Sequence, residues 1–162
     1  MKSIVISPHP DDEVLGCGAS IAKWTEAGNE VHVLILAEGA TSRDTIRNPE
    51  NRIDELSALA KAAHSSGDIL GVTSVRLLNF PDNRLDSMDL LDVIIGVEEQ
   101  IERINPEMVC THHSGDLNID HRITHQAVVT ACRPQPGQVV RRLLTFEVPS
   151  STEWQPTSSA LP

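Results

Sequence analysis

Aromatic residues are scarce in this sequence of 162 residues, which has two tryptophans, two phenylalanines and no tyrosine. Proteins that bind single-stranded nucleic acids stack the bases on aromatic side chains, so this composition argues against that role. Basic residues are also outnumbered, with 13 lysines and arginines against 23 acidic residues and a formal net charge of −10. A surface of this sign repels the phosphate backbone and anionic membranes, and we therefore expect no nucleic-acid partner.

Cysteines and long hydrophobic runs are lacking as well. Cys17, Cys110 and Cys132 are odd in number and far apart, so they form neither a zinc-finger spacing nor a disulfide framework. This pattern predicts a reducing, cytoplasmic environment. No apolar run reaches the roughly 20 residues that span a bilayer, and the N-terminus has no signal-peptide pattern, so we expect no stable membrane insertion.

What is present predicts one domain. The length and the apolar content of 40% are typical of a soluble globule with a sizeable core. We place this domain at residues 1–148. Residues 149–162 are rich in Ser, Thr and Pro, and we interpret them as a tail or as the start of a missing C-terminal segment.

Strand and helix patterns alternate along the domain. Apolar runs predict strands at 2–7, 30–37, 75–80, 107–112 and 141–148. Helical spacing predicts helices from residue 14 to 27–29, from about 49 to 70, from a cap at Asp86 or Ser87 to about 104, and over 120–132. This alternation indicates an α/β fold, a three-layer sandwich with a Rossmann-like, mostly parallel sheet and helices on both faces. A strand order of 3-2-1-4-5 would place the first strand beside the fourth.

The stretch Ser7-Pro8-His9-Pro10-Asp11-Asp12-Glu13 joins the first strand to the first helix. His9 and Asp12 are three residues apart, so a turn can direct both at one point while Asp11 points elsewhere. Two ligands beside a free carboxylate are the layout of a hydrolytic metal site. The alternative is helix capping, in which the acidic residues complement the helix dipole. A bound cation would relieve the repulsion among these acids.

A second polar cluster covers residues 111–125 and follows the fourth strand. It holds four of the seven histidines: His112, His113, His121 and His125. His121 and His125 are four apart and could bind a metal together, whereas His112 and His113 are equally consistent with loop histidines. Asp120 is equally plausible as a helix N-cap. Ligand sites of doubly wound sheets gather at the carboxyl ends of neighbouring strands, so the two clusters should face one crevice.

At these residues the chain resembles the N-acetylglucosaminylphosphatidylinositol de-N-acetylase family, also called PIG-L-like or LmbE-like. The first family motif is matched by Pro8-His9-Pro10-Asp11-Asp12-Glu13 and the second by Asp116-Leu117-Asn118-Ile119-Asp120-His121. The likeness continues through Arg52-x-x-Glu55, Phe80-Pro81-Asp82 and Phe146-Glu147-Val148-Pro149-Ser150-Ser151.

The resemblance implies that His9, Asp12 and His121 hold a zinc ion (Zn²⁺). It implies that Asp11 is the general base of a hydrolase that removes an acetyl group from an N-acetylated amino sugar or a related amide. The partner would then be a small-molecule substrate, an N-acetylated sugar conjugate, and a homo-oligomer stays open. The resemblance also suggests substrate contacts for Arg52 and Asp82.

The chain departs from the family at Asn118, where many members carry a histidine that stabilises the oxyanion. Either another group takes that role, with His113 and His125 as the candidates, or the metal acts alone. Asn118 itself could hydrogen-bond the oxyanion or a sugar hydroxyl. Two other functions remain open. The first is a metal-dependent hydratase acting on a small unsaturated carboxylic acid, with the arginines Arg43, Arg47 and Arg52 as carboxylate clamps. The second is a non-catalytic sugar-binding protein.

Overall fold

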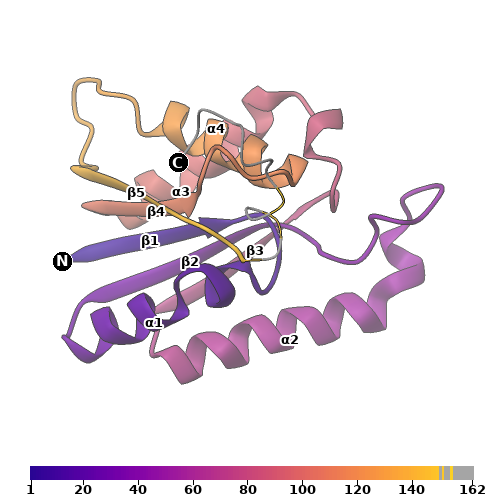
Figure 1. Ribbon diagram of the computed structural model, residues 1–162, viewed down its shortest axis with the longest axis horizontal. Coiled ribbons are helices and arrows are strands. Elements are labelled where there is room, and N and C mark those ends of the chain that lie inside the picture. Colours follow the sequence, from indigo (N-terminus) through magenta and orange to yellow (C-terminus); the bar gives the residue numbers. More distant parts are fainter. Residues whose placement is uncertain (150, 152–153, 155–162) are drawn as a thin grey trace.

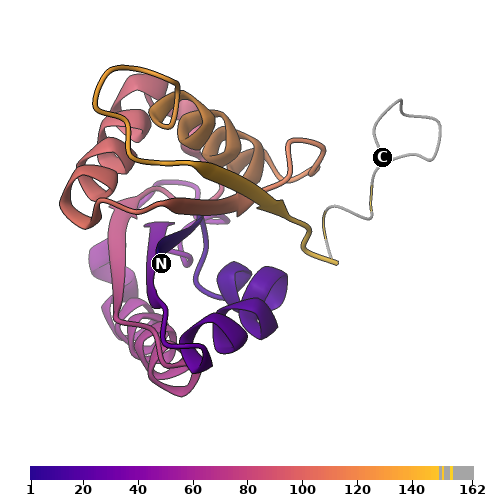
Figure 2. The same ribbon diagram turned by 90° about the vertical axis from the view of Figure 1, so that its left-hand side faces the viewer.

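The computed structural model shows one parallel sheet covered by helices on both faces, as Figures 1 and 2 show. It describes residues 1–149, 151 and 154. The strands are β1 (Lys2–Ser7), β2 (Glu30–Ala37), β3 (Ser74–Phe80), β4 (Met108–His112) and β5 (Arg142–Phe146). The helices are α1 (Asp12–Glu26), α2 (Ile53–Leu70), α3 (Leu90–Ile104) and α4 (Ile119–Ala131), with short 3-10 helices η1 (Pro49–Arg52) and η2 (Leu85–Ser87).

The strands lie in the order β3-β2-β1-β4-β5, and every neighbouring pair is parallel. This confirms the predicted fold class and strand order. β1 pairs with β4 through Ser3 opposite Met108 and Val5 opposite Cys110. The carboxyl ends of these two central strands therefore meet at one edge of the sheet, where the two polar clusters begin.

Both faces of the strands β1, β2 and β4 are buried, as is usual for parallel strands covered by helices on both sides. Ile4 and Ile6 of β1 pack with Val97 of α3 and Val128 of α4 in one core cluster. Val5 points the other way and packs with residues of α1 and α2 in the second cluster. This pattern produces the three layers. No helix in the described part of the chain is long and apolar enough to cross a membrane.

Several predicted boundaries differ from the structure by one to four residues, and three of these differences are described here. Neither Asp86 nor Ser87 caps α3, because both lie in η2 and the extended backbone at Met88 separates that turn from α3. Helix α4 begins at Ile119, and its N-cap is Asn118 rather than Asp120. Strand β5 ends at Phe146, two residues before the predicted end.

Candidate metal centre

The turn that follows β1 has a strained backbone at Asp11, which has a φ of +143°. Asp11 occupies the N-cap position of α1, with Asp12 and Glu13 in the first turn, but its side chain makes no capping hydrogen bond. The carboxylates instead accept hydrogen bonds from the turn itself. Glu13 Oε2 accepts from the Asp11 N–H at 3.1 Å, and Asp12 Oδ2 accepts from the His9 N–H at 3.2 Å. These bonds bury Asp12 and Glu13 and leave Asp11 exposed.

The loop after β2 packs closely against this turn. The Ala37 N–H donates to the Pro8 carbonyl at 2.8 Å. Gly39 has a φ of +82°, and a Cβ at that position would lie 2.7 Å from Cδ of Pro10. Only glycine allows this approach without displacing the proline. The turn that carries His9 and Asp12 is thus supported from the β2 side.

The start of α4 supplies the other half of the site. The Asn118 side chain accepts hydrogen bonds from the N–H groups of Asp120 and His121, at 2.9 and 3.4 Å. Such an N-cap fixes the first helical turn. His121 Nε2 then lies 3.3 Å from Asp12 Oδ2, while Asp120 Oδ2 lies 3.2 Å from His9 Nε2. The two polar clusters therefore meet, as the strand order predicted.

His9, Asp12 and His121 form a compact group of possible ligands, with one atom of each within 4.8 Å of the others. His9 Nδ1 and His121 Nε2 lie 3.2 and 3.3 Å from Asp12 Oδ2. A tetrahedral ion with bonds of ~2.0–2.1 Å separates its ligands by roughly 3.3 Å. Two imidazoles and one carboxylate are also a common donor set of catalytic zinc sites. The residues therefore fit a metal ion of this kind.

Outer contacts orient both histidines. His121 Nδ1 lies 2.9 Å from Asp116 Oδ2, and the same oxygen accepts a hydrogen bond from Ser151 Oγ at 2.8 Å. His9 Nε2 faces Asp120, and Asp82 Oδ1 lies 3.4 Å away. A carboxylate behind a histidine fixes which ring nitrogen points at a metal. Both histidines have this support.

The charges of the cluster are suited to a cation. Burial alone would lower the pKa of His9, but hydrogen bonds to Asp12 and Asp120 outweigh it and raise that pKa to about 10. Burial opposes ionisation of Asp12, yet three neighbouring histidines hold its pKa well below the usual range. Burial also opposes the charge of His121, but Asp12 and Asp116 raise its pKa. The acidic residues thus draw positive charge onto the two imidazoles, the charge that a bound cation would bring.

Two further carboxyl groups of the turn have raised pKa values. For Asp11, partial desolvation and then the Asp12 charge raise the pKa. For Glu13, burial raises the pKa to about 7. Asp11 is the exposed member of the pair, so it is the carboxyl group that an incoming molecule can reach.

His112 belongs to this centre, although the sequence alone did not single it out. It is fully buried, and its Nε2 lies 3.4 Å from Asp12 Oδ2. Its ring stacks on that of His121, with centroids 3.8 Å apart. Its position at the carboxyl end of β4, the strand beside β1, is the signal that could have identified it.

Three further candidates from the sequence, His125, His113 and Arg52, have polar partners within the chain. His125 Nδ1 donates to the His112 carbonyl at 2.8 Å, and His113 Nδ1 accepts from the Gly115 N–H at 3.1 Å. Arg52 forms ion pairs with Asp44 and Glu55 at 2.6 and 2.8 Å.

Asp82 is buried, and its Oδ2 accepts from the Ser42 N–H at 3.1 Å. Asn118 uses Nδ2 to donate to Asn83 Oδ1 at 3.0 Å. The polar side chains of Asp82 and Asn118 thus join neighbouring loops to the metal centre.

The predicted tail contributes to the site through Ser151, which is 4% exposed. Its hydroxyl contacts Asp116 and lies 3.3 Å from His121 Nδ1. Apart from Pro149, Ser151 and Trp154, the predicted tail lies outside the described residues.

A parallel α/β sheet with a buried His-Asp-His group at its carboxyl edge, beside an exposed carboxylate, is the arrangement of a metal-dependent hydrolase. The model of one protein family, PIG-L: GlcNAc-PI de-N-acetylase, matches residues 4–132. The chain belongs to this family.

Individual relatives agree with this assignment. The chain is 33% identical over 155 residues to the uncharacterized deacetylase YaiS of Escherichia coli K12, an alignment of 91% of this chain and 74% of YaiS. It is 28% identical over 137 residues to a probable N-acetyl-alpha-D-glucosaminyl L-malate deacetylase 2 of Bacillus cereus, with 83% of this chain and 62% of that protein aligned. It therefore spans less than two thirds of the second relative.

The solved structure of an enzyme with a different activity has the same fold. GalB, the 4-carboxy-2-hydroxymuconate hydratase of Pseudomonas putida KT2440, superposes with a TM-score of 0.68 and 26% identity, over 86% of this chain and 62% of GalB. The family scaffold therefore also occurs in a hydratase.

Proposed function

We propose that this protein is a zinc-dependent hydrolase that removes the acetyl group from an N-acetylated amino sugar conjugate. The observation that carries the proposal is the buried group of His9, Asp12 and His121 beside the exposed Asp11. Family membership and the deacetylase names of the relatives support it. We assign the three buried side chains as the ligands of the ion and Asp11 as the general base.

When bound, Zn²⁺ supplies a Lewis acid that polarises an amide carbonyl and activates water. Asp11 stands next to ligand Asp12 but on the solvent side of the turn, so its carboxylate can take the proton of the attacking water. The same carboxyl group can then deliver that proton to the departing amine. Asp116 and Asp120 keep the imidazoles of His121 and His9 oriented during this exchange.

Asn118 is our candidate for the group that stabilises the developing negative charge on the carbonyl oxygen. Its Oδ1 is used by the helix cap, and one amide hydrogen is donated to Asn83. The second amide hydrogen is the donor that we assign to the substrate. A preorganised donor of this kind contributes roughly 2.7–4 kcal/mol to the transition state. His113 and His125 are the other candidates.

The hydratase alternative needs arginines that are free to bind a dicarboxylic acid. Arg47 instead donates to both Glu38 oxygens, at 2.9 and 2.7 Å. Arg52 is held by Asp44 at 2.6 Å. Two of the three proposed clamps are thus neutralised by carboxylates of the chain, which favours an amide substrate over an unsaturated acid.

Release of acetate from a panel of N-acetylated sugars tests the proposal. The purified protein should release acetate from at least one conjugate, lose this activity after chelation, and regain it when Zn²⁺ is returned. A conjugated unsaturated dicarboxylic acid in the same panel tests the hydratase, because hydration removes its ultraviolet absorbance. Loss of absorbance without acetate release would overturn the deacetylase assignment, and saturable sugar binding without turnover would favour a binding protein.

A further inference from the structure

His112 has an environment that neither a core residue nor a surface histidine explains. The side chain is fully buried, and neither ring nitrogen has a hydrogen-bond partner among the described residues. Nε2 nevertheless lies 3.4 Å from Asp12 Oδ2, just beyond good hydrogen-bond length. Buried polar atoms without partners are rare, and an apolar residue would avoid this cost at position 112. A functional role for the ring nitrogens would account for this cost.

The ring of His112 lies beside two of the proposed metal ligands, His121 and Asp12. His112 stacks on His121 with ring centroids 3.8 Å apart and an interplanar angle of 34°. Its other neighbour is Phe146, at a centroid distance of 4.6 Å. Asp12 Oδ2 is approached by His9 Nδ1, His121 Nε2 and His112 Nε2 at 3.2, 3.3 and 3.4 Å. One oxygen thus faces two proposed ligands and one additional imidazole.

The burial of His112 limits what it can do. With no exposed surface, the ring cannot touch a substrate or exchange protons with it directly. A hydrolytic metal site also keeps one coordination position open, so a fourth protein ligand would work against turnover. The role compatible with both conditions is to hold the ligands in place.

We propose that His112 is a positioning residue of the metal centre. Its Nε2 is directed at Asp12 Oδ2, 3.4 Å away, and carries the proton on that side. Its ring fixes the plane of His121, so that both ligands are set at metal-binding spacing. Phe146 also contacts the ring, with centroids 4.6 Å apart. This inference rests on the metal centre of the proposed function, and it is independent of the sugar that the enzyme accepts.

Metal affinity measured by competition with a chromophoric chelator tests this role directly. His112→Phe keeps a planar ring for stacking but removes both nitrogens. We expect it to bind one Zn²⁺ about 10- to 100-fold more weakly, the usual effect of losing an outer-shell partner. His112→Gln places an amide N–H near the former Nε2 and should restore most of the lost affinity.

His32→Phe is the matched control, because His32 is also buried but lies at the start of β2, away from the metal centre. It loses hydrogen bonds to Ser74 and Glu30 and should become less stable without changing zinc affinity. Wild-type affinity in His112→Phe would overturn the proposal. Complete loss of stoichiometric zinc would also overturn it, by making His112 a ligand.

A measurement on the unaltered protein covers the case in which His112→Phe does not fold. Long-range ¹H–¹⁵N spectra of ¹⁵N-histidine-labelled protein report which ring nitrogen carries the proton. His112 should keep its proton on Nε2 with and without Zn²⁺, whereas a ligand nitrogen loses its proton. An unprotonated Nε2 in the zinc-loaded protein would overturn the proposal. Failure of the wild-type protein to bind any metal would instead refute the proposed function.

Discussion

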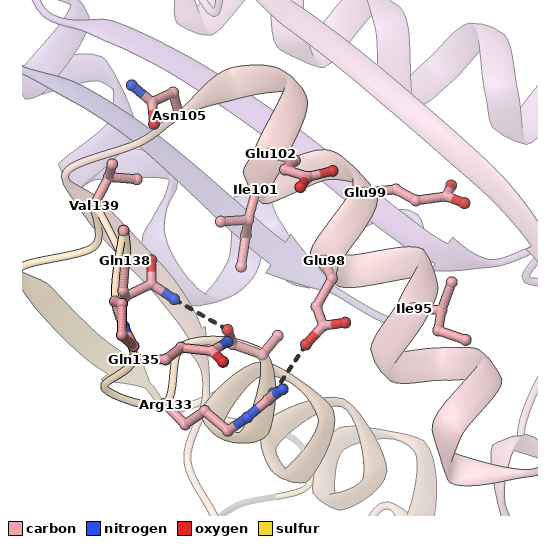
Figure 3. Close-up of a pocket in the computed structure, with 13 residues that line it drawn as sticks. Ile95, Glu98, Glu99, Ile101, Glu102, Asn105, Arg133, Gln135, Gln138 and Val139 are labelled. Atoms are coloured by element: carbon pink, nitrogen blue, oxygen red, sulfur yellow. Dashed lines mark hydrogen bonds and ion pairs between the residues drawn. The ribbon is translucent and has the colours of Figure 1, made fainter.

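The candidate metal centre and the cleft between α3 and the loop after α4 lie at opposite edges of the sheet. The metal centre is at the carboxyl ends of β1 and β4. The cleft holds about 500 Å³ and includes Asn105, just before β4, and Val139, just before β5 (Figure 3). Either region could be taken for a binding site, the first for its chemistry and the second for its volume.

The charged side chains are exposed in the cleft and buried in the candidate metal centre. In the cleft, Glu98 pairs with Arg133 at 2.8 Å, and their side chains are 37% and 50% exposed (Figure 3). In the metal centre, Asp12 and His121 are 6% and 4% exposed. Water screens the first pair, whereas burial strengthens the second. The difference teaches that the candidate metal centre is distinguished by convergent, desolvated side chains and the cleft by its volume alone.

Removal of a proposed ligand should have the largest effect and is the most direct way to break this comparison. His121→Ala should abolish stoichiometric metal binding and with it acetate release, because only two ligands remain. Elemental analysis of protein purified without chelator measures this. His64→Ala, on the exposed face of α2, is the control and should keep its metal. Full metal content in His121→Ala would move the third ligand elsewhere, first to His125.

The next effect separates chemistry from metal binding within the turn. Asp11→Asn keeps the shape of the side chain but cannot accept a proton, so turnover should fall ~10²–10⁴-fold while metal content stays near one per chain. Steady-state kinetics and metal analysis on the same sample measure both. Glu99→Gln removes a carboxylate from the cleft and should leave turnover unchanged. Loss of metal in Asp11→Asn would make Asp11 a ligand and reverse the assigned roles.

A smaller effect is expected behind the ligands. Asp116→Asn removes the carboxylate that faces His121 Nδ1 and should weaken metal binding by about 10- to 100-fold. Ser151→Ala leaves that carboxylate in place but removes one of its donors, and should weaken metal binding less. Chelator competition can rank the two variants. Equal affinities in both variants and the wild type would show that these outer contacts do not support the metal centre.

The smallest effect should come from the cleft. Arg133→Gln breaks the ion pair with Glu98 and should lower the free energy of unfolding by only ~0.2–1 kcal/mol, because the pair is largely exposed. Denaturant titration measures this, and acetate release should not change. A large loss of activity in this variant would contradict the separation of the two regions.

Much of the fold could be predicted because its signals are local. The apolar run of β2 and the helical spacing of α2 each appear within one segment, and the alternation of such segments indicates a parallel sheet. The start of α3 could not be fixed in this way. Asp86, Ser87 and Asp89 are all suitable cap residues, and the local pattern does not reveal that Asp86 and Ser87 belong to the separate turn η2, which begins at the buried Leu85.

The candidate site could also be predicted only where its signals are local or follow from the strand order. His9 and Asp12 are linked by short-range spacing, and strand order brings His121 to them. The role that we propose for His112 depends on contacts with Phe146, 34 residues away, and with His121, so no local pattern distinguishes it from His113. The ion pairs of Arg47 and Arg52 likewise depend on how residues 38–48 fold, and sequence spacing does not reveal that they are already neutralised.

The backbone at Asp11 carries a consequence for efforts to make this protein more robust. A residue other than glycine at a φ of +143° costs on the order of 1–3 kcal/mol. Replacement by glycine would relax this strain, so a selection for heat resistance alone should favour Asp11→Gly. The same change would delete the proposed base. Stability and activity therefore compete at this one position, and thermostable versions should be sought by changing residues elsewhere in the chain.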